Sequence, residues 1–99
     1  MIDEYTLEQA KAKGVRAETL LDNELLTEAF GTLEQGYISA WRATTIDDVS
    51  AREKLFLAIN IVGKVRDHLG AAIANGKLAQ AELNELTRTA ERRKRFGVL

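Results

Sequence analysis

The sequence predicts an all-α fold in a single small domain, and three observations support this prediction. Proline is absent from the 99 residues, and the chain is rich in Ala, Leu, Glu, Lys, Arg and Gln, which lose little freedom in a helix. Apolar residues recur at spacings of three and four, as they do on one face of a helix. No stretch of five or more residues combines clean apolar–polar alternation with β-branched side chains, so we expect no strands.

The first helical segment is expected within residues 1–19. Leu7 and Ala10 lie on one face of a helix over residues 3–13. This helix reaches Gly14, which either ends it or lies inside a longer helix, because glycine both weakens helix interiors and closes helix ends. The sequence leaves both alternatives open.

The second segment has the strongest helical pattern of the chain. Its apolar residues lie four, three, four and four positions apart and form one stripe: Leu26, Phe30, Leu33, Tyr37 and Trp41. Leu21 and Leu25 widen this stripe upstream. We therefore expect about twenty residues of helix, roughly 30 Å long, with one apolar face.

A cluster of hydrogen-bonding side chains then predicts a turn and a new helix start: Thr44, Thr45, Asp47, Asp48 and Ser50. Ser50 and Glu53 have the spacing of a capping box. The helix that follows has apolar positions at three-and-four spacing: Leu55, Ala58, Ile59, Val62, Val65, Leu69 and Ile73. It should stop at Asn75 and Gly76, because glycine closes helices in the left-handed conformation. A shorter helix with a basic end is expected over residues 77–95.

Two helices of similar length joined by a short connection should fold back on each other, so we expect an antiparallel helical hairpin over residues 20–75 and a shorter C-terminal helix. In this hairpin the stripe of the second segment is expected to pack against Leu55, Ile59, Val62 and Leu69. The apolar run over residues 55–62 covers more than one side of a helix, so either the C-terminal helix of the same chain or a second copy must cover the rest, and we favour a second copy. Gly63 and Gly70 either admit a closely packed helix or are simply tolerated.

Charge divides the chain into two halves. Residues 1–50 carry ten Asp and Glu against four Lys and Arg, and residues 51–99 carry ten Lys and Arg against five Asp and Glu. The basic half therefore has two candidate partners, an external polyanion or the acidic half of the same or a neighbouring chain. Because the halves meet at the predicted turn, we expect neutralisation between acidic and basic arms, within the chain or between subunits, to account for most of the basic residues.

A basic cluster lies near the end of the chain, and its last four residues exceed what the paired arms need: Arg88, Arg92, Arg93, Lys94 and Arg95. It complements the dipole at the end of a helix, or binds nucleic acid, or binds an acidic protein surface. Trp41 with Arg42 is either a stacking platform for a partner or part of the core or self-interface.

The sequence contains no recognisable catalytic or metal-binding constellation. Cysteine is absent, and the single histidine, His68, has neither a nucleophile in local context nor a second ligand at a fixed spacing. We expect no enzymatic activity, no cofactor and no small-molecule substrate. The acidic N-terminal residues are unlike a secretory signal, and the longest apolar run, residues 55–59, is too short to span a bilayer. A cytoplasmic protein without membrane contact is therefore expected.

An ordered set of residues carries a family resemblance: Leu20, Leu21, Asp22, Asn23, Glu24, Leu25, Phe30, Trp41, Arg42, Ala43, Thr44, Asp48, Arg52, Glu53, Lys54, Leu55, His68, Leu69, Gly76, Lys77 and Leu78. Over residues 20–80 the chain resembles small all-helical proteins encoded in the tailed-phage and prophage genomes of bacteria. The resemblance implies virion assembly or genome packaging, where such proteins commonly act as oligomeric adaptors. The leading hypothesis is thus a self-associating helical protein with protein partners, and the alternative is a nucleic-acid-binding accessory protein that uses its basic C-terminal helix.

Overall fold

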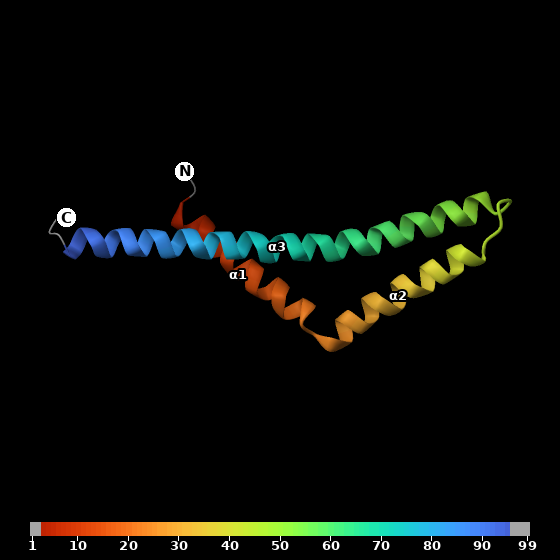
Figure 1. The fold of residues 1–99 in the computed structure, drawn as a ribbon, viewed down its shortest axis with the longest axis horizontal. Coiled ribbons are helices and arrows are strands. Elements are labelled where there is room, and N and C mark those ends of the chain that lie inside the picture. Colours follow the sequence, from red (N-terminus) through yellow and green to blue (C-terminus); the bar gives the residue numbers. More distant parts are fainter. Residues whose placement is uncertain (1–2, 96–99) are drawn as a thin grey trace. The chain divides into compact units, whose positions relative to one another are not determined.

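The structure is a computed structural model that describes residues 3–95. It contains three α-helices, α1 (Glu4–Leu21), α2 (Glu24–Ala43) and α3 (Val49–Arg95), shown in Figure 1. No strand occurs within these described residues, which confirms the predicted all-α class. The helices contribute to two compact units, one made of Met1–Glu18 with Gly70–Leu99 and one made of Thr19–Leu69.

Short polar side chains begin the first two helices. The backbone N–H of Thr6 donates to Asp3 Oδ1 over 2.7 Å at the start of α1. At the start of α2 the N–H of Leu26 donates to Asn23 Oδ1 over 2.9 Å, so each side chain satisfies a backbone donor that has no partner inside the helix. Gly14 lies inside α1, which settles the alternatives in favour of the longer helix.

The cluster of hydrogen-bonding residues forms the connection between α2 and α3, as predicted. Thr44 closes α2, since its N–H and its hydroxyl both donate to the carbonyl of Trp41, over 3.2 and 2.6 Å. Asp48 Oδ2 accepts from the N–H of Thr45 over 2.9 Å, and the carbonyl of Asp48 accepts from the N–H of Arg52 over 2.9 Å. Helix α3 begins at Val49, so Ser50 lies in its first turn rather than at the predicted cap position.

The prediction of a helix end at Asn75 and Gly76 was wrong. Helix α3 continues without a break for 47 residues, so the separate C-terminal helix does not exist. Gly76 is buried and lacks a left-handed backbone; what its missing side chain permits is close contact with α1. A heptad repeat also runs through this point, because a set of apolar or small residues recurs every seven positions: Leu55, Val62, Leu69, Gly76 and Leu83.

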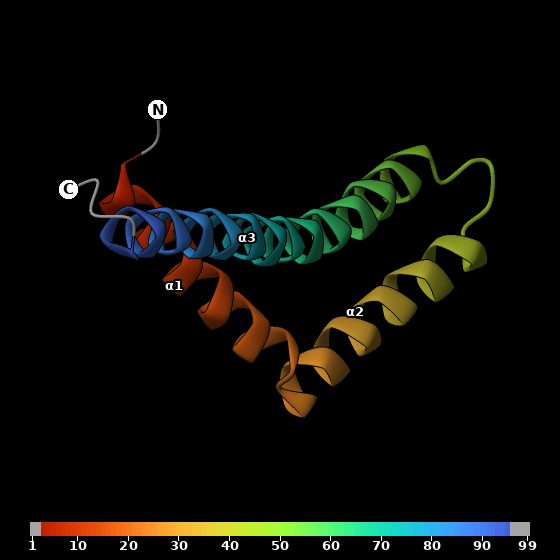
Figure 2. The same ribbon diagram turned by 60° about the vertical axis from the view of Figure 1, so that its left-hand side comes forward.

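In the first unit, α1 crosses the later part of α3 in the opposite direction (Figures 1 and 2). The two helices approach most closely at Gly14 and Gly76, where a Cβ atom built on Gly14 would lie 2.8 Å from the Cα atom of Gly76. Beside this crossing Leu7, Ala79 and Leu83 form a buried cluster. Small side chains therefore let two backbones come close, and leucines fill the space where the helices separate.

In the second unit, α2 contacts the first part of α3 through long side chains. Arg66 of α3 pairs with Glu34, and Arg52 stacks on Trp41. Partner numbers rise along α2 as they fall along α3, so the two helices run antiparallel. They are closest near the connection at residues 44–48 and diverge away from it (Figures 1 and 2). Val62 is the buried hydrophobic residue of this unit, and no residue of α2 is buried.

Candidate protein-interaction surfaces

The buried core of the described residues is small. Its hydrophobic members are Leu7, Ala17, Val62, Ala79 and Leu83, and no large side chain is fully buried. Many large hydrophobic residues remain exposed: Tyr5, Val15, Leu20, Leu25, Leu33, Ile46, Val49, Phe56, Leu57, Ile61, Val65, Leu78 and Leu86. Scattered exposed hydrophobic residues are normal, but several of these recur at helical spacing and therefore form continuous stripes.

The residues predicted to form the hairpin core differ in burial. Val62 is buried, and those that are half-buried are Leu26, Phe30, Tyr37, Trp41, Leu55, Ile59 and Leu69. Leu33 is 49% exposed. Its neighbour Glu34 takes the position that faces α3, and one residue along a helix turns the side chain by about 100°. Most of the predicted core side chains are only half-buried because α2 diverges from α3.

Arg52 covers the ring of Trp41. Its guanidinium carbon lies 4.7 Å from the ring centroid, and its Nη1 donates to Thr44 Oγ1 over 2.8 Å. The adjacent Arg42, which the sequence grouped with Trp41 as a candidate contact for an outside partner, is exposed. A cation–π contact of this kind contributes about 0.5–1 kcal/mol at an exposed site. Arg52 lies eleven residues beyond Trp41, so only the register of the turn could have identified it.

Arg66 makes the contact between the acidic and basic halves. Its Nη1 lies 2.8 Å from Glu34 Oε2, and its guanidinium carbon lies 5.4 Å from the ring centroid of Phe30. The Arg66 and Glu34 side chains are 42% and 29% exposed, so their ion pair contributes only about 0.2–1 kcal/mol. Within residues 3–95 this is the one ion pair that joins the two halves, so neutralisation inside the chain accounts for few of the basic residues.

Two exposed apolar stripes lie on the second unit. On α3, Leu57, Ile61 and Val65 follow one another every four residues and are 54%, 59% and 45% exposed. On α2, the exposed positions at similar spacing are Leu25, Ala29, Leu33, Gly36 and Ala40. Together these eight residues are called the open face below. Gly36 has no atom within 4 Å of where a Cβ would stand, so nothing in its own surroundings excludes a side chain.

The basic cluster is exposed on the last turns of α3: Arg88, Arg92, Arg93, Lys94 and Arg95. Arg88 pairs with Glu85 over 3.1 Å on the same helix. The other four have no ion-pair partner among the residues that the structure describes. Four cations in the last turn complement the partial negative charge at a helix C-terminus.

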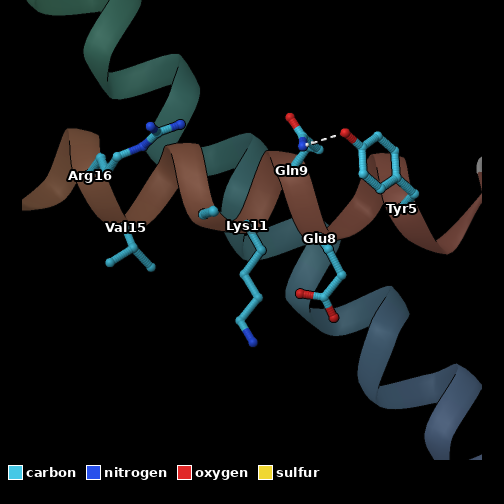
Figure 3. A pocket seen from close by; sticks show the side chains of 7 residues that line it. Tyr5, Glu8, Gln9, Lys11, Val15 and Arg16 are labelled. Carbon is cyan, nitrogen blue, oxygen red and sulfur yellow. Dashed lines mark hydrogen bonds between the residues drawn. The ribbon is translucent and has the colours of Figure 1, made fainter.

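Two hollows of the first unit differ in the helices that line them. The hollow in Figure 3 is lined by α1 alone, where Gln9 Nε2 donates to the hydroxyl of Tyr5 over 2.9 Å. Because one helix lines it, it has no opposite wall. A second hollow between α1 and α3 is lined by Leu7 and Leu86 and by the carboxyl groups of Asp3, Glu4, Glu82 and Glu85. There the N–H and the side chain of Thr6 bond to Asp3 and hold its pKa below the ordinary value of 3.8.

The described part of the chain contains no candidate metal site. No group of three or more His, Asp or Glu side chains in residues 3–95 is placed to hold a metal ion, and His68 is exposed. None of the three helices has the length and apolar character needed to cross a bilayer. Comparison with protein-family models, with curated proteins and with solved structures found no match to this chain.

Proposed function

We propose that this chain is a non-enzymatic, self-associating helical protein that acts through protein–protein contacts. The observation that carries the proposal is apolar surface. In the second unit, Thr19–Leu69, Val62 is the buried hydrophobic residue, whereas large hydrophobic side chains along α2 and α3 are 45–75% exposed: Leu25, Leu33, Phe56, Leu57, Ile61 and Val65. Association would remove such side chains from water, and this is the main favourable term in most protein–protein binding.

In this proposal α2 and the first part of α3 act as a helical hairpin. The contacts of Arg52 with Trp41 and of Arg66 with Glu34 hold the two helices antiparallel but leave most of their hydrophobic residues half-buried. A two-helix unit has little interior of its own, and helical hairpins commonly complete their core by pairing with further helices. The hairpin is thus the part of the chain that gains most from a partner.

The native mass in solution tests the proposal. Sedimentation of the full chain at micromolar concentration should give a dimer or a higher species. The mass should shift toward the monomer on dilution. A monomer throughout this concentration range would refute self-association.

The resemblance of residues 20–80 to phage and prophage proteins supports an adaptor or structural role in phage assembly or genome packaging. In that setting the partner is a further copy of the chain or another assembly protein. The genes beside the coding sequence test this setting, since portal, capsid or terminase genes are expected there. A neighbourhood of unrelated metabolic genes would contradict it.

The exposed basic turn favours a second candidate, nucleic-acid binding through the end of α3. Arg92, Arg93, Lys94 and Arg95 would gain free energy on a polyanion by releasing its counterions, without reading its sequence. Glu82, Glu85 and Glu91 lie on the same stretch of helix and weaken its positive field. Replacing the four cations with alanine should abolish a salt-sensitive mobility shift of duplex DNA. Absence of any shift by the unaltered chain at low salt would remove this candidate.

A further inference from the structure

We propose that the open face of the second unit binds the same face of a second copy, so that two hairpins form a four-helix bundle. The eight residues of this face are Leu25, Ala29, Leu33, Gly36, Ala40, Leu57, Ile61 and Val65. The inference rests on the proposed self-association and names its surface. It depends on three properties of the face: its two stripes share one side, they complement each other in size, and their area suits a dimer.

The two stripes lie on the same side of the helix pair. Glu34 and Arg66 face each other across the antiparallel helices, with 2.8 Å between their charged groups. Leu33 precedes Glu34 by one residue and Val65 precedes Arg66 by one residue. Two antiparallel helices are related by a twofold axis perpendicular to the plane that contains them. One step back along each helix therefore turns both side chains toward the same side of that plane. Leu33 and Val65 therefore point out of one surface, and the other members of each stripe lie up to about 80° farther around the helix, toward its outer edge.

The face is complementary to itself in side-chain size. The contacts of Glu34 with Arg66 and of Trp41 with Arg52 place Gly36 and Ala40 at about the level of Ile61 and Leu57. In a dimer whose twofold axis runs parallel to the helices, α2 of each copy lies on α3 of the other at the same level. The small positions then oppose the large ones, as in interdigitated helix packing.

This arrangement also explains the glycine. Gly36 is exposed inside a helix and nothing in its own chain stands near its missing Cβ, yet glycine weakens a helix interior relative to alanine. A large side chain from a second copy would need that space. Leu33, one turn away from Gly36, would instead meet Val65 of the other copy, which is the smallest member of the α3 stripe.

The area suits a specific dimer. Twenty residues of helix are about 30 Å long, and two helices side by side are about 20 Å wide. The face therefore offers on the order of 600 Å² per copy, or about 1,200 Å² in total, which is the lower end of specific interfaces. A second copy supplies this area with the same apolar chemistry, whereas an unrelated partner would have to supply both.

Matched substitutions on α3 test the face. Ile61→Lys places a charge at its centre and should weaken the dimer about tenfold or more in sedimentation equilibrium of the full chain. Phe56→Lys is the control, because Phe56 is 57% exposed but lies about 140° around the helix from Ile61. The control should keep the mass of the unaltered chain. Equal weakening by both substitutions, or by Phe56→Lys alone, would overturn the assignment.

A size swap tests the pairing itself and does not depend on a charged variant folding. Gly36→Leu raises helix propensity, so helical circular dichroism should be kept, but the leucine fills the space assigned to Ile61 of the other copy. It should weaken the dimer, and Ile61→Ala added to it should restore at least part of the affinity. Gly31→Leu is the control, since Gly31 also has open space at its Cβ position on the same helix. Absence of rescue by the double variant would refute the proposed pairing.

The outcomes separate this inference from the proposed function. An unaltered chain that stays monomeric refutes both. An unaltered chain that dimerises, while Ile61→Lys and Gly36→Leu leave its mass unchanged, refutes only the open face and leaves self-association standing.

Discussion

Replacing Gly76 with alanine should reveal the close crossing of α1 and α3. A Cβ at Gly76 would lie 2.9 Å from the Cα of Gly14 and 3.1 Å from the carbonyl oxygen of Ala10. Both are backbone atoms, so no side-chain rotation relieves the contact and the helices must move apart. Ordinary contacts of this kind are 3.4 Å or longer, so the separation would have to grow by about half an ångström around a tightly packed point.

Two opposing effects determine the size of the change. Alanine is better than glycine in a helix interior by about 1 kcal/mol, which favours the variant. Overpacking against a neighbouring backbone costs about 1–3 kcal/mol, which opposes it. We therefore expect Gly76→Ala to change the free energy of unfolding by between about zero and a loss of 2 kcal/mol.

Gly63→Ala provides the matched control on the same helix. Gly63 has no atom within 4 Å of its Cβ position, so only the gain in helix propensity should remain, up to about 1 kcal/mol. The difference between the two variants then isolates the crossing at about 1–3 kcal/mol. Urea unfolding followed by circular dichroism at one fixed chain concentration measures it, because self-association would shift the midpoint with concentration. Equal stabilisation by Gly76→Ala and Gly63→Ala would refute the close contact.

Three further predictions concern single polar residues. Asn23→Ala removes the cap of α2 and should cost about 1 kcal/mol of unfolding free energy in urea, whereas Asn23→Ser should restore most of it. Arg52→Ala uncovers the half-buried ring of Trp41 and should shift its fluorescence to longer wavelength, whereas Arg42→Ala should leave the spectrum unchanged. Asp3 has a lowered pKa in the folded chain, so its contribution to the free energy of unfolding is present above the ordinary value of 3.8 and is lost as the pH falls through the lower folded pKa. The unfolding midpoint of Asp3→Asn should therefore change less with pH over this window than that of the unaltered chain. An equal pH response of the two chains would contradict the role of Asp3.

The fold class, the start of α1, the end of α2 and the start of α3 could be predicted because local chemistry decides them. The break between α1 and α2 at residues 22–23 and the continuation of α3 through Gly76 were not predicted. The cluster over residues 44–50 contains the capping and turn residues that end α2 and precede α3. Gly76 misled because glycine has two opposite uses, a left-handed helix end and a close helix contact, and its immediate neighbours do not distinguish them. The signal that could have done so was the heptad repeat that continues from Leu69 through Gly76 to Leu83.

The interaction surfaces were harder to predict than the helices. Periodicity showed that the run over residues 55–62 covers more than one side of α3, but it did not show which residues face α2. That depends on Glu34 and Arg66, whose pairing turns Leu33 and Val65 outward. Charge counts likewise do not give the ion pairs within the chain, because each exposed pair contributes too little to impose its geometry.

The heptad stripe of α3 contacts α1 in the first unit and α2 in the second, and the two contacts differ in how closely the helices pack. This difference explains where a partner would be needed. In the first unit its members Gly76 and Leu83, together with Ala79, lie against α1: the lack of a side chain at Gly76 allows backbone contact with Gly14, and Ala79 and Leu83 are buried with Leu7. In the second unit the stripe meets α2 through Val62 and through the long side chains of Arg52 and Arg66, which hold α2 at a greater distance. Hydrophobic residues beside a contact of that kind stay half-exposed. The first unit can therefore bury its own stripe, whereas the second gains buried area only when further helices pack on its open face.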